Sequence, residues 1–189
     1  MPPLAYNPEA AFGRITPAAF AIRTALSANA AFQSLLDDPS APDAESKAAE
    51  SVQVGIVDDP WLDEDATKDD LDQLLLRAYL TSANDQALRV ERGDTVAGCP
   101  SETFALHLGI RRQFRDIEMA DDGGASAFLA FWDAVSALPH DLYDETRLST
   151  NVESVDLMGM PWMPERAEAA AQGEHAMAEL LITIGPPAR

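Results

Sequence analysis

The chain has 189 residues, 47% of them hydrophobic, which is long and apolar enough to bury one core. Thirteen Lys and Arg residues against 32 Asp and Glu give a formal net charge of −19, beyond the ~2–8 charges usual for a small domain. This charge argues against a DNA-gripping surface and against binding to an anionic membrane, because both need cations on the protein. No stretch approaches the ~20 apolar residues of a membrane span and no secretory signal is visible, so we expect a soluble protein made in the cytoplasm.

Residues for covalent or metal chemistry are sparse. Cys99 is the only cysteine, which excludes an internal disulfide framework and a multi-cysteine zinc site, and it has no basic neighbour to form a thiolate. The three histidines are scattered singly, without the spacing of metal ligands. Neither a phosphate-binding glycine loop nor a serine nucleophile elbow occurs. We therefore expect no enzymatic activity, no cofactor and no metal site.

The first third of the chain is predicted to hold an arm, a helix and a loop. Residues 1–16 show little periodicity and contain three prolines, so we expect a flexible N-terminal arm. A helix is expected from Pro17 at the first helical position to Leu36, with Asn29 as a candidate interruption. Residues 39–50 are rich in Ala, Pro, Asp and Ser and predict a loop.

The middle of the chain is predicted to form strands. Residues 52–56 alternate and predict one strand, whereas 71–81 fits a helix and a strand equally well. The clearest strand begins at Phe104 and alternates as far as Ile110, and we expect it to continue to Ile117. Its apolar face is expected to share a core with Phe128, Phe131 and Trp132 of the next helix.

The C-terminal third is predicted to hold one helix and two strands. The helix spans residues 125–138, where Pro139 is expected to stop it. Strands are expected over 147–158 and 178–184, separated by a polar connection. The predicted fold class is α+β: a mostly antiparallel sheet with two main helices packed on one face. Residues 17–189 form a single domain in this interpretation.

An acidic insertion around residues 58–72 stands out in this domain. It does not fit a calcium-binding loop, because Lys68 occupies the place of the central glycine and Leu74 that of the distal glutamate. A carboxylate cluster could hold Mg²⁺ for phosphodiester chemistry, and a second candidate set is Asp116, Glu118, Asp121 and Asp122. We expect no cationic or histidine partner beside either set, which favours a solvated acidic loop.

Two tryptophans lie in loop-like segments flanked by prolines and are candidates for contacts between subunits. Trp61 adjoins the acidic run, and Trp162 is followed by Met163 in the sequence Met-Pro-Trp-Met-Pro. Loop aromatics and methionines without a local core are typical of protein contact surfaces, and simple loop packing is the alternative.

The order of these elements resembles that of the tail terminator (tail completion) proteins of long-tailed, siphovirus-type bacteriophages. An N-terminal helix closes with Ser27-Ala28-Asn29-Ala30-Ala31-Phe32-Gln33-Ser34-Leu35-Leu36, a long strand leads into a helix, and a final strand pair flanks a polar connection. The resemblance covers residues 17–185 and rests on element order rather than an invariant motif. It implies a strand over residues 73–82 and carries over no catalytic residues.

The resemblance further implies a homo-oligomeric ring, usually a hexamer, at the neck of the virion. Such a ring caps the tail tube, docks on the head-side connector (stopper) protein and lets genome DNA pass without specific binding. Carboxylates facing a pore would repel phosphates and let DNA slide. The candidate DNA-channel acids are Asp58, Asp59, Asp63, Glu64, Asp65, Asp69 and Asp70.

Three other functions remain open at this point. A tail tube or other neck protein would have a similar acidic character. An acidic DNA-mimic inhibitor would need carboxylates spaced along one face, whereas the densest run here includes Pro60. A metal-dependent nuclease would use one of the two carboxylate sets.

Overall fold

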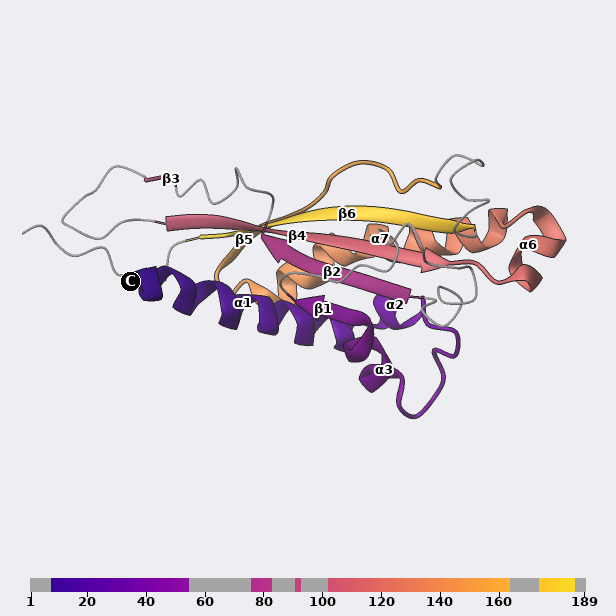
Figure 1. Ribbon diagram of the computed structural model, residues 1–189, viewed down its shortest axis with the longest axis horizontal. Helices are drawn as coiled ribbons and strands as arrows, with labels where there is room; N and C mark the ends of the chain where they lie inside the picture. The colour runs from indigo at the N-terminus through magenta and orange to yellow at the C-terminus, as the bar shows by residue number, and fades with distance from the viewer. Residues whose placement is uncertain (1–7, 55–75, 83–90, 93–101, 164–173, 186–189) are drawn as a thin grey trace, which may run out of the picture.

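The computed structural model describes residues 8–54, 76–82, 91–92, 102–163 and 174–185 (Figure 1). Its elements are, in chain order, α1 (Pro8–Ala28), α2 (Ala30–Gln33), α3 (Ala44–Ser51), β1 (Val52–Val54), β2 (Leu76–Ser82), β3 (Glu91–Arg92), β4 (Glu102–Gln113), α6 (Asp116–Asp122), α7 (Ala125–Thr146), β5 (Val152–Leu157) and β6 (His175–Ile184).

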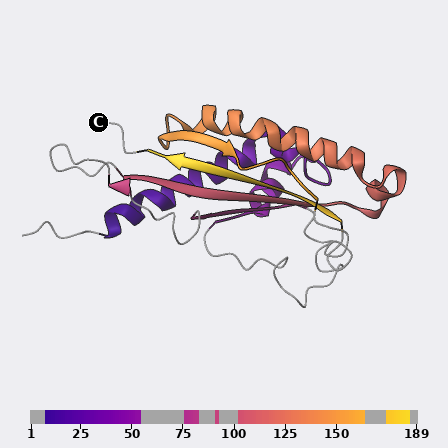
Figure 2. The same cartoon turned by 90° about the horizontal axis from the view of Figure 1, so that it is seen from above.

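The sheet confirms the predicted α+β class. Its strand order is β1-β2-β4-β6-β5, with β3 paired to one end of β4. All pairings are antiparallel except that of β1 with β2, which is parallel. The long strands β4 and β6 form the centre, and β1 and β5 are the edges. Figure 2 shows α7 lying along one face of this sheet.

One core fills the space between the helices and that face. Alternate residues of β4 are buried, namely Leu106, Leu108 and Ile110, as the sequence alternation predicted. Both main helices contribute to the same core, α1 through Ile22 and Leu26 and α7 through a longer row of residues. The buried residues of α7 are Phe131, Ala134, Val135, Leu138, Leu142 and Thr146.

The N-terminal helix begins earlier than predicted. Residues 8–16 are helical and belong to α1, whereas the sequence pattern predicted no regular structure there. Residues 1–7 lie outside the described part, and the flexibility of the arm stays a prediction. Pro17 is inside the helix rather than at its first position. The alanines on either side of it explain the extension, because alanine has the highest helix propensity. The predicted interruption at Asn29 is confirmed, since its side chain caps α2 by accepting a 3.0 Å hydrogen bond from the Phe32 N–H.

Two further segments differ from the sequence prediction. The predicted loop over 39–50 contains α3, in which Ala44 and Ala48 are buried one turn apart. The ambiguous segment is a strand where the structure describes it, because β2 pairs with β1 on one side and β4 on the other. Pairing with β4 along its whole length, and with β1 at residues 78–80, satisfies backbone groups of β2, and the local sequence pattern contains no signal for these two partners.

The end of β4 and the end of α7 also differ from the sequence prediction. The strand ends at Gln113 rather than continuing to Ile117, and the short helix α6 follows. Gly124 closes this turn with φ +83°, and a Cβ there would lie 2.5 Å from the Met119 sulfur. The helix α7 begins at Ala125 as predicted but continues through Pro139 to Thr146. Burial of Leu142 and Thr146 outweighs the hydrogen bond that proline removes.

The final strand pair is present with shifted boundaries. Strand β5 begins at Val152, later than the predicted position 147, and a register irregularity between Val152 and Ser154 interrupts its pairing with β6. Strand β6 begins at His175 and ends at Ile184, close to the predicted range.

Candidate functional site

Most of the predicted functional residues lie outside the part of the chain that the structure describes. This applies to Trp61 and to all seven candidate DNA-channel acids, Asp58, Asp59, Asp63, Glu64, Asp65, Asp69 and Asp70. Their proposed roles therefore stay predictions from the sequence.

The second candidate contact, Trp162, lies on the surface beside β6. Its backbone forms an isolated antiparallel bridge with Met177, with N–H to O distances of 3.0 and 2.9 Å. The bridge holds the backbone in place, yet 40% of the tryptophan is exposed. The neighbouring Met163 is half-buried and packs against the hydrophobic core, so it is less accessible than Trp162.

Trp162 belongs to a surface patch that sequence reasoning identified only in part. Met158 and Met160 precede it at alternate positions and are 55% and 72% exposed. These three residues, here called the Met-Trp patch, follow directly on the edge strand β5. The sequence contains a signal for this patch, namely large apolar residues at every second position. Their exposure could not be predicted, because it depends on which strand lies beside this segment in the fold.

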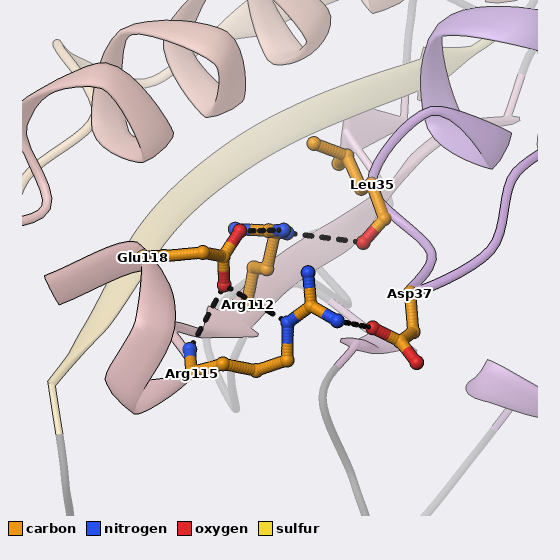
Figure 3. A network of polar contacts seen from close by, with 5 residues as sticks. All are labelled: Leu35, Asp37, Arg112, Arg115 and Glu118. Carbon is orange, nitrogen blue, oxygen red and sulfur yellow. Dashed lines mark hydrogen bonds and ion pairs between the residues drawn. The ribbon is translucent and has the colours of Figure 1, made fainter. Parts of the chain in front are cut away.

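A polar network joins the end of β4 to the segment after α2 (Figure 3). Arg112 donates from Nε to the carbonyl oxygen of Leu35 at 3.0 Å and from Nη2 to Oε1 of Glu118 at 2.7 Å. Its guanidinium also lies 5.4 Å from the centre of the Phe114 ring. Arg115 extends the network, because it forms ion pairs with both Asp37 and Glu118.

Glu118 is the acceptor at the centre of this network. Burial raises its pKa, but hydrogen bonds from the Arg115 N–H and the Arg112 guanidinium, together with both positive charges, outweigh burial and hold the pKa below its ordinary value. The Oε2 atom accepts from the Arg115 N–H at 2.8 Å, which satisfies a free donor at the start of α6. Glu118 is thus a structural carboxylate that remains ionised.

This arrangement corrects the expectation that no cation accompanies the second carboxylate set. Arg112 and Arg115 both contact Glu118. Asp122 has a different task, since its carboxylate accepts from the hydroxyl and the N–H of Ser126, and these two bonds lower its pKa. Within the described ranges, no three His, Cys, Asp or Glu side chains gather closely enough to hold a metal ion.

The face of the sheet opposite α7 carries its own charged residues. Arg77 of β2 lies directly opposite Arg111 of β4, and Arg111 lies opposite Met177 of β6. The same row reaches Trp162 through its bridge to Met177. One row further along, Glu179 lies 3.7 Å from His107. This face therefore carries cations, an acid and apolar side chains, and these residues are spread over several strands rather than grouped into one site.

Comparison with protein families, with curated proteins and with solved structures finds no match for this chain. The helices that the structure describes include none long and apolar enough to cross a membrane.

Proposed function

We propose that this chain is the tail terminator subunit of a long-tailed bacteriophage. In this proposal it forms a homo-oligomeric ring, expected to be a hexamer, between the tail tube protein and the head-side connector protein. Genome DNA passes through the ring without specific binding. The chain acts as a structural part of the virion and catalyses no reaction.

The observation that carries the proposal is the order of the elements. A long helix precedes the strands, the longest strand β4 leads into the helix α7, and the antiparallel pair of β5 and β6 closes the fold. This order agrees with the resemblance drawn from the sequence. The strand β2 adds support, because the resemblance implied a strand where the local pattern was evenly divided.

The charge of the chain also supports a passage role. A hexamer would multiply the subunit charge of −19 six-fold, and carboxylates that face a pore keep DNA phosphates from adhering. Repulsion between subunits must then be offset by apolar contacts and by salt, which limits the range of the field to about 8 Å at physiological ionic strength.

Quantitative mass spectrometry of purified particles tests the proposal. A terminator contributes the copy number of a single ring per particle, whereas a tail tube subunit contributes many times more. A high copy number per particle would favour the tail tube alternative. Absence from purified particles would overturn both structural functions, and capture of a nucleic-acid enzyme by the isolated chain would then favour the DNA-mimic inhibitor.

A second experiment addresses the acidic run. Changing Asp58, Asp59 and Asp63 to Asn should leave folding and assembly intact and make DNA ejection slower or more sensitive to salt, because the pore would then repel DNA less. The matched control changes three exposed acids of α7, Asp133, Asp144 and Glu145, to amides. Equal effects of the two variants on ejection would contradict a specific role for the run.

A further inference from the structure

Among the described residues, exposed large hydrophobic side chains lie closest together in the sequence at the Met-Trp patch. Seven large hydrophobic residues are exposed in the described ranges. Three of them, Met158, Met160 and Trp162, fall within five positions of the sequence. Neighbouring apolar side chains that remain exposed are typical of protein contact sites. Methionine and tryptophan are also the residue types that contact surfaces favour, since methionine adapts its shape and tryptophan offers a large rigid area.

The backbone of the patch is held in place before any partner arrives. The Met158 N–H donates to the carbonyl oxygen of Glu179 at 2.8 Å, and Trp162 exchanges two hydrogen bonds with Met177. Pro161, between the two anchors, is buried. Because both ends are tied to the central strand β6, binding here costs little backbone entropy. In Figure 1 this stretch runs from the end of β5 along β6.

Charge around the patch selects the kind of partner. Asp156 is exposed two positions before Met158. Glu179 holds Met158 through its backbone carbonyl, while its carboxylate lies 3.7 Å from His107 on the β4 side of β6. Arg111 is the nearest described arginine in the row of Trp162, and β6 separates the two. The whole chain carries −19. An apolar surface with an exposed acid at its rim, on a strongly acidic protein, attracts a cationic partner and repels an acidic one.

We propose that the Met-Trp patch binds a basic polypeptide segment of another protein, one that presents apolar side chains together with Lys or Arg. The apolar side chains would cover Met158, Met160 and Trp162, and the cations would lie over Asp156. A second copy of this chain is the competing occupant, and the subunit contacts of the proposed ring would then lie here. With 13 Lys and Arg residues against 32 acids, a second copy matches an acid at the rim less well than a basic segment does. The proposal does not depend on the virion function.

Titration with synthetic amphipathic peptides tests this inference. The probe is a helical peptide of Leu and Lys, compared with a Leu and Glu peptide and with a Ser and Lys peptide. Binding is followed by calorimetry and by the NMR signals of the methionine methyl groups. We expect the Leu and Lys peptide to bind at least about tenfold more tightly than either comparison peptide and to shift the Met158 and Met160 signals.

Variants of the chain locate the binding. Met160→Ser should weaken binding of the Leu and Lys peptide about tenfold, and Trp162→Ser should weaken it further. The control is Leu148→Ser, which removes a 91% exposed leucine before the opposite end of β5 and should leave the affinity unchanged. Because Met160 is 72% exposed, its variant keeps the test valid if Trp162→Ser fails to fold.

Four results would overturn the inference. The peptide could bind Met160→Ser as tightly as the natural chain, or the Ser and Lys peptide could bind equally well, which would make the attraction purely electrostatic. The Leu and Glu peptide could bind as tightly as the Leu and Lys peptide. The patch signals could instead shift with protein concentration alone, which would make a second copy the occupant. The copy number in particles decides the virion proposal separately.

Discussion

The contribution of individual residues to the stability of this fold can be measured by single substitutions. Phe131 is fully buried between α7 and the sheet, so replacing it with Ala should lower the free energy of unfolding by ~3–5 kcal/mol through lost burial and the cavity left behind. Urea unfolding measures this change. Leu129 on the same helix is 58% exposed, and Leu129→Ala should change the free energy by less than about 0.5 kcal/mol. Similar losses in both variants would contradict the burial assigned to Phe131.

The ionisation of Glu118 makes the free energy of unfolding depend on pH. Because its pKa in the folded protein lies below the ordinary value of 4.5, the ionised carboxylate stabilises the fold above that pH, and this stabilisation is lost as the pH falls through the folded pKa. Glu118→Gln should therefore lower the free energy of unfolding by about 1–3 kcal/mol at neutral pH and by progressively less below pH 4.5. Chemical unfolding at a series of pH values measures the difference.

An exposed carboxylate provides the control for Glu118. Asp43 pairs with Lys47 at 3.2 Å while both side chains are about half exposed, so Asp43→Asn should cost less than about 0.5 kcal/mol. The difference in free energy of unfolding between Glu118→Gln and the natural chain should shrink in acid. If it stays the same there, the charge of Glu118 is not what stabilises the network.

At the scale of elements, α7 continues past a proline because of what it covers. Pro139 lacks the N–H that would bond to the carbonyl of Val135, and such a position costs about 3 kcal/mol in an ordinary helix. Pro139→Ala should restore that donor and raise the melting temperature, with a gain in stability of up to about 3 kcal/mol. Thermal unfolding followed by circular dichroism measures it.

The same reasoning applies to the other interior proline. Pro17 is exposed within α1, so Pro17→Ala should also stabilise the protein. If Pro139→Ala lowers the melting temperature while Pro17→Ala raises it, the Pro139 ring itself contributes packing that the alanine cannot replace.

At the scale of the whole molecule, the charge of −19 opposes compaction. Raising the ionic strength from ~0.01 M to ~0.15 M shortens the Debye length from ~30 Å to ~8 Å, so the melting temperature should rise with salt. Differential scanning calorimetry at several sodium chloride concentrations measures this response. A melting temperature that falls with salt would mean that attractive pairs such as Arg112 with Glu118 dominate the electrostatics.

Local periodicity was sufficient to predict the central elements. The alternation of β4 and β6 and the start of α7 after Gly124 could be predicted because side-chain direction and glycine geometry depend on a few neighbouring residues. The α+β class and the mostly antiparallel sheet followed from the order of these elements. The sequence alone also determined the charge, which restricts the partners of this chain.

Boundaries and the ambiguous segment were decided only by the tertiary structure. Residues 76–82 form a strand because β4 pairs with them along one edge and β1 pairs with residues 78–80 on the other. The helix α7 passes Pro139 because Leu142 is buried beyond it. The same holds for the surface sites. Arg112 joins Glu118 to the carbonyl oxygen of Leu35, which lies 77 positions before it, and the exposure of Met160 depends on how the chain leaves β5. The bond from Arg112 to Leu35 and the pairing of β2 with β1 and β4 join residues distant in sequence, and a local pattern carries no information about such contacts.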